Sequence, residues 1–107
     1  MNLLELKDSS NNSLLHIAVI DNNYELIEYL LVKKVNINSV NNEGDTPLHL
    51  AIRKMNYNVI QLLLDYNADI DIMNNKNESA VDIASMDIKK YFALENKLML
   101  KRYGNKK

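Results

Sequence analysis

The sequence predicts an all-α solenoid of stacked helix–turn–helix units joined by tight turns. Two observations support this fold class. The chain repeats itself with a period of about 33 residues, and each repeated unit carries two short apolar segments with helical spacing. One such unit cannot bury both of its faces, whereas stacked neighbours bury a continuous core. With 107 residues, 47% of them apolar, the chain is predicted to form one domain.

The clearest helix start is the segment Gly44-Asp45-Thr46-Pro47-Leu48-His49-Leu50-Ala51. Proline fits the first turn of a helix, because its missing N–H would have no partner there in any case. The threonine before it is a good N-cap, and the glycine indicates a tight turn. The octet therefore predicts a turn, a cap and a helix that begins at Pro47.

The same segment recurs on both sides of the octet. One shift by the repeat period places 13–18 on 46–51, and a second shift places 79–84 on the same positions. The predicted organisation is a partial N-terminal unit (1–8), two full repeats (9–41 and 42–74), a shortened repeat with a C-terminal capping helix (75–103) and a basic tail (104–107).

Each full unit is predicted to contain two short helices. In the second unit the first helix is expected over about 47–54 and the second over about 59–65, where nearly every residue is apolar. Asn67 suits a left-handed residue that ends the second helix. The alternating stretch 69–72 is then expected to be extended and to lead into the next turn.

The C-terminal region predicts one more helix. Apolar residues at helical spacing run through 87–103, and basic residues near the end of this segment complement the helix dipole. The simplest role for this helix is to cap the solenoid. The alternatives are an amphipathic helix for a membrane surface or a partner groove, or a homodimer contact.

The repeat period, the octet at 44–51 and the segment Asn56–Asp71 that follows it resemble an ankyrin repeat. The first unit has Leu14 in place of the proline and Asn11 in place of the turn glycine. Lys34 and Met55 stand where the family usually has glycine, and a left-handed backbone there would be strained. The resemblance implies an ankyrin-repeat solenoid in which the turns between units project as β-turn or hairpin fingers. It also implies that protein partners bind to these fingers and to the exposed face of the first helices.

The sequence predicts no catalytic residue, no metal site and no cofactor. His16 and His49 are the only histidines and lie one repeat apart, about 10 Å on stacked helices, which is too far for a shared zinc ion. The resemblance gives this histidine a structural role, hydrogen-bonded around its own turn, and Asp82 at the third equivalent position suits a cap-like role. Two glycines leave no room for a phosphate-binding loop. The protein is therefore not expected to be an enzyme.

Composition narrows the classes of partner. The net charge of −1 argues against a general nucleic-acid binder, and no window is long and apolar enough for a membrane span. The absence of cysteine and of a signal peptide pattern fits an intracellular, cytoplasmic location in the organism's own cell or in a host cell. The 17 asparagines are interpreted as codon bias with no functional meaning.

Candidate partner-binding positions follow from the resemblance, and they also lie in turns or at polar breaks in the apolar pattern. The candidates are Ile20, Asp21, Val40, Asn42, Glu43, Asp45, Arg53, Lys54, Met73, Asn75, Lys76 and Glu78, with Met86, Asp87, Ser9, Ser10 and Asn12 extending the row. Ile20, Val40, Ile72 and Met73 are the most informative, because apolar side chains that cluster at a surface need a reason.

The sequence thus favours a protein–protein interaction module without catalysis, whose preformed concave surface loses little ordering entropy on binding. The alternative is a self-associating structural subunit or a fragment of a longer array, because an uncapped solenoid end exposes apolar surface. The partner is expected to be another protein, and both a monomer and a homodimer fit the sequence.

Overall fold

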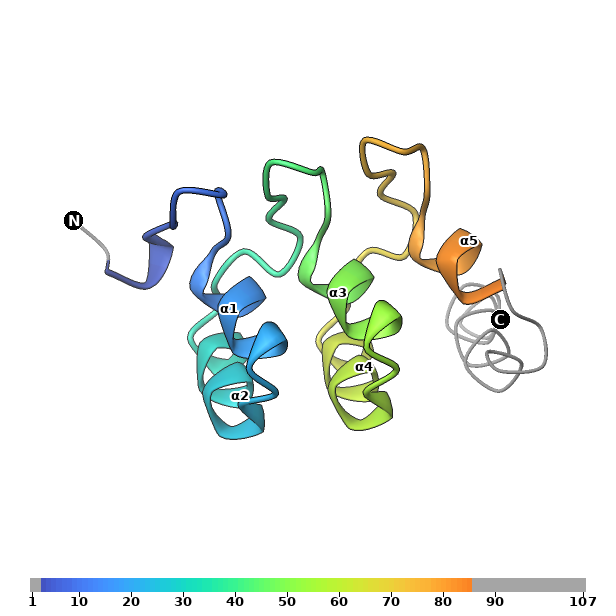
Figure 1. Cartoon of the computed structure of the whole chain (residues 1–107). Helices are drawn as coiled ribbons and strands as arrows, with labels where there is room; N and C mark the ends of the chain where they lie inside the picture. The colour runs from blue at the N-terminus through green and yellow to red at the C-terminus, as the bar shows by residue number, and fades with distance from the viewer. Residues whose placement is uncertain (1–2, 86–107) are drawn as a thin grey trace.

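The computed structural model describes residues 3–85 and shows a row of helix pairs with three finger loops along one edge (Figure 1). The elements are η1 (Leu3–Glu5), α1 (Leu14–Ile20), α2 (Tyr24–Val32), α3 (Pro47–Arg53), α4 (Tyr57–Asp65) and α5 (Ala80–Ser85). This confirms the predicted all-α solenoid. The expected capping helix over 87–103, the basic tail, and the candidates Met86 and Asp87 lie outside the described residues.

The helices begin where the sequence places caps. Ser13 and Thr46 have extended backbones, and their side chains accept the N–H of His16 and His49 respectively. The second helices are capped by asparagine, which shifts one boundary. The Asn56 side chain accepts the N–H of Val59, so α4 starts at Tyr57, two residues earlier than its apolar pattern indicates.

The core is one continuous apolar layer between the helices of successive units. Helix α1 packs against α2 within its own unit and against α3 in the next, and α3 in turn packs against α4 and α5. Ala18, Ala51 and Ala84, one per unit, are all essentially buried, which lets neighbouring helices approach closely. Stacking therefore buries the faces that a single unit would leave exposed.

The links after the helices use left-handed residues. Asn67 has a φ of 67°, as predicted, and Asn22 has a φ of 53° after α1. Lys34 and Met55 also adopt positive φ, at 61° and 54°. Asparagine tolerates this region well, whereas lysine and methionine are strained there.

The fingers are tight turns with little strand character. Within residues 3–85 the only pairing of strand type is an isolated antiparallel bridge between Lys7 and Ser13. The stretch 69–72 is irregular, with Ile70 buried and Ile72 half-buried. None of the helices in this part of the chain has both the length and the apolar character needed to span a bilayer.

Candidate functional site

An asparagine at the base of each of the second and third fingers holds the turn together. The Asn41 side-chain oxygen accepts the N–H groups of Glu43 and Asp45, and Asn74 does the same for Lys76 and Glu78. Asp8 accepts the equivalent bonds in the first finger. Side chains that bond to the backbone a few residues ahead stabilise such turns. These asparagines therefore have a structural role, and codon bias alone does not account for them.

Neighbouring fingers are joined into a ladder. The N–H of Asn42 donates to the carbonyl of Ser10, and the N–H of Asn75 donates to the carbonyl of Glu43, each at 3.0 Å. Gly44 has a φ of 77°, and a Cβ there would lie 2.8 Å from the backbone nitrogen of Asn75. Asparagine fills the equivalent positions of the other two fingers, with φ of 64° at Asn11 and 60° at Asn77, so the backbone angle alone does not require glycine. The close approach of the third finger is what favours glycine at position 44.

The two histidines join each unit to the next one. Nδ1 of His16 lies 3.1 Å from the backbone nitrogen of Ser13, and Nε2 lies 2.7 Å from the carbonyl oxygen of Asp45. A backbone N–H can only donate and a carbonyl can only accept, so Nδ1 is unprotonated and Nε2 carries the hydrogen. His49 repeats this arrangement, at 2.9 Å to Thr46 N and 2.9 Å to the Glu78 carbonyl.

The environment of His16 favours its neutral form. Burial is the main cause that lowers its pKa, since the charged ring would lose solvation, although the bond to the Asp45 carbonyl acts in the opposite direction. Asp82 keeps only the local half of the interaction, because its carboxylate accepts the N–H of Ser79 at 2.9 Å. The predicted cap-like role of Asp82 is therefore confirmed, and the histidines do more than tie their own turns.

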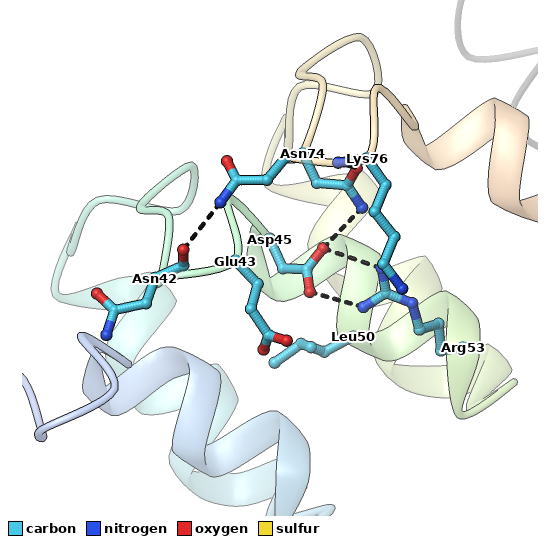
Figure 2. Close-up of a pocket in the computed structure, with 8 residues that line it drawn as sticks. Asn42, Glu43, Asp45, Leu50, Arg53, Asn74 and Lys76 are labelled. Atoms are coloured by element: carbon cyan, nitrogen blue, oxygen red, sulfur yellow. Dashed lines mark hydrogen bonds and ion pairs between the residues drawn. The ribbon is translucent and has the colours of Figure 1, made fainter.

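A hollow of about 390 Å³ lies between the second and third fingers, above the exposed side of α3 (Figure 2). We call it the groove. Its lining residues are Asn42, Glu43, Asp45, Leu50, Arg53, Asn74, Asn75 and Lys76. The fingers form its walls, and α3 supplies Leu50 and Arg53 as its floor.

An ion pair lies at the base of the groove. Arg53 donates to both carboxylate oxygens of Asp45, at 2.7 and 3.0 Å, and its Nη2 lies 3.6 Å from Glu78. Asn74 donates to the same Asp45 carboxylate at 3.0 Å. Burial alone would raise the pKa of Asp45, but the hydrogen bonds from Arg53 and Asn74 and the Arg53 charge outweigh burial and lower it. The bond to Asp45 is the main cause that raises the pKa of Arg53.

Most of the candidate positions are exposed to solvent. Ile20, Asp21, Val40, Asn42, Glu43, Arg53, Lys54, Met73, Asn75 and Lys76 are exposed, and Glu78 is half-buried. Four of them, Asn42, Glu43, Asn75 and Lys76, come together on the walls of the groove. Ser9 and Ser10 are exposed on the first finger, and Asn12 is half-buried.

Asp45 is the exception, and the expectation that it belongs to the exposed row is wrong. The residue is only 3% exposed, because its carboxylate is enclosed by Arg53 and Asn74. Sequence reasoning also missed Leu50 and Asn74 as groove residues. Asp45 lies on a turn, and Arg53 carries the opposite charge eight residues later on the following helix. This spacing could have indicated the ion pair.

No group of three or more histidine, cysteine, aspartate or glutamate side chains that could hold a metal ion occurs among residues 3–85. The family whose sequence model is described as "Ankyrin repeats (3 copies)" matches residues 2–87. A comparison with curated proteins gave no match.

Proposed function

Because the chain belongs to the ankyrin-repeat family, whose repeats generally serve as protein-interaction modules, we propose that it binds a protein partner through its finger tips and concave helix face. The family match covers residues 2–87 and therefore all three fingers. The proposal assigns no catalysis to the chain, and it assigns the contacts to the exposed row of candidate residues.

The observation that carries the proposal is that hydrogen bonds hold the backbone of the fingers while apolar side chains on the same fingers remain exposed to solvent. The bases of the second and third fingers are held by buried Asn41 and Asn74, and the three fingers are joined by the ladder of hydrogen bonds. Val40 and Met73, which occupy equivalent positions in successive fingers, nevertheless remain 39% and 56% exposed. Apolar side chains held on a preorganised edge bind with little loss of conformational entropy.

The experiment compares two faces of the same molecule. The full chain, its Val40→Asp/Met73→Asp variant and a control variant, Tyr29→Asp/Val32→Asp, are used to capture proteins from the native source. Tyr29 and Val32 are also exposed but lie on α2, away from the fingers (Figure 1). The captured protein is then purified, and its affinity for each variant is measured by calorimetry.

We expect the finger variant to bind at least about tenfold more weakly, since charged side chains would replace two apolar contacts. The control variant should bind like the wild type, and circular dichroism should show that both variants are folded. A partner that binds the finger variant normally and loses affinity for the α2 variant would refute the proposed function.

A further inference from the structure

The walls of the groove carry opposite charges that form no direct ion pair within the described residues, although the Glu43 carboxylate interacts with the Arg53 charge at longer range. Glu43 lies on the second finger, and Lys76 lies at the equivalent position on the third. Within residues 3–85 both ion pairs closer than 4.0 Å belong to Arg53, and neither the Glu43 carboxylate nor the Lys76 ammonium makes a hydrogen bond there. Figure 2 shows both side chains directed toward the groove floor.

The positive charge of Arg53 on the groove floor is already paired with a carboxylate of the protein. The Arg53 guanidinium is held by two bonds to Asp45, and its side chain is 38% exposed. Because its charge is matched by Asp45 and by nearby Glu78, the floor offers a partner a fixed planar surface beside half-buried Leu50. A guanidinium fixed in this way stacks well on an aromatic ring, and leucine adds an apolar contact.

We propose that the groove takes an extended segment of the protein partner in which an aromatic residue is flanked by one basic and one acidic residue. The aromatic ring lies over Leu50 and Arg53, the basic residue faces Glu43, and the acidic residue faces Lys76. This inference rests on the proposed function and names the chemistry that its groove selects. The hollow of about 390 Å³ has room for a large side chain.

The spacing of the motif follows from the repeat. Neighbouring units lie about 10 Å apart, as packed helices do. In an extended chain, residues i, i+2 and i+4 face the same side, and i and i+4 are about 13 Å apart. With the aromatic residue at i+2, the charged side chains at i and i+4 therefore reach the two finger walls.

The test uses synthetic peptides with a central tyrosine and charges two residues away on either side. Four peptides carry lysine and glutamate in either order, two glutamates, or two lysines. Two mixed orders are needed because an extended peptide can lie in either direction. A fifth is a mixed-charge peptide with alanine in place of tyrosine. Affinities for the full chain are measured by NMR titration at low ionic strength, where exposed charges are least screened.

The wild type should prefer a mixed peptide over both singly signed peptides by about two- to fivefold, the effect of one exposed ion pair. Glu43→Lys should shift the preference to the doubly acidic peptide, and Lys76→Glu should shift it to the doubly basic one. The mixed-charge peptide with alanine in place of tyrosine should bind the wild type more weakly than the mixed-charge peptides with tyrosine. Glu28→Lys on α2 and Lys33→Glu at the C-cap of α2 are matched controls that change the net charge equally and should leave the order unchanged.

If a substituted finger fails to fold, Glu43→Gln and Lys76→Gln replace the reversals and should abolish the preference. Absence of peptide binding, or an order that the finger variants do not change, would overturn this inference. Because the partner measurements with the Val40 and Met73 variant are independent of these peptides, such a result would leave the proposed function standing.

Discussion

The first and second units begin their leading helices in the same way but present different surfaces beside them. In both, a hydroxyl residue caps the helix and a buried histidine reaches the carbonyl of the next finger. Asn12 and Ile20 occupy the positions in the first unit that Asp45 and Arg53 occupy in the second. Ile20 is 45% exposed and apolar, whereas Arg53 is anchored by an ion pair.

The difference shows which positions support the fold and which set the surface. Asn12 and Asp45 both accept a bond from the asparagine of the following finger, at 3.0 Å in each case. Asp45 adds a negative charge and a second oxygen, and Arg53 uses both of them. A buried carboxylate needs compensation of its charge as well as hydrogen bonds, whereas the neutral amide of Asn12 needs hydrogen bonds only.

The largest loss of stability should come from removing the buried histidine that the first and second units share. His49→Ala removes two contacts of a buried ring, one within its own turn and one to the next finger, and leaves a cavity. We expect a loss of about 2–4 kcal/mol in the free energy of unfolding. Asp82→Ala removes a contact within one turn only and should cost about 1 kcal/mol. Urea unfolding followed by circular dichroism measures both, and equal losses would contradict this ranking.

A middle-sized effect should come from converting the second unit into the first. Arg53→Ile alone leaves the Asp45 carboxylate buried without its cation and should cost about 1–3 kcal/mol, below the figure for a fully buried pair because Arg53 is partly exposed. The double variant Asp45→Asn/Arg53→Ile recreates Asn12 and Ile20 and should recover most of that loss. A double-mutant cycle measures the coupling, and additive losses would contradict it.

Much of the fold could be predicted because its signals are local. The repeat period located the units, and Thr46, Pro47 and Ser13 located the starts of α1 and α3. Asn67 was predicted correctly because a left-handed helix end is a short-range feature. The start of α4 was placed too late because the apolar pattern begins after its asparagine cap.

The site was less predictable, because its key bonds join one repeat to the next. A linear pattern places His49 and Asp45 near the same turn but does not show that the ring reaches Glu78, or that Asn74 encloses the Asp45 carboxylate. The same applies to Asn41 and Asn74. The number of asparagines in the composition suggested codon bias, whereas the equivalent positions of these two in successive fingers show their use in the turns.

The smallest expected effect is a pH dependence of the free energy of unfolding that is due to His16 in the first unit. The pKa of His16 is lower in the folded protein than its ordinary value, mainly because of burial. The unfolded chain therefore binds the proton more readily, and stability falls as the pH drops below about 6.5, the ordinary pKa of histidine. The lowered pKa of Asp45 acts in the same direction, but its contribution begins only below about pH 4.

His16→Gln removes the titrating group, and His49 is present in both proteins. We expect the free energy of unfolding of the wild type to decrease between pH 7.5 and 5.5 more than that of the variant, measured by urea unfolding at each pH. A variant with the same slope would show that His16 titrates alike in the folded and unfolded chains. A steeper wild-type slope would mean that protonation of His16 loosens the turn of the first unit, because a hydrogen on Nδ1 would oppose the N–H of Ser13.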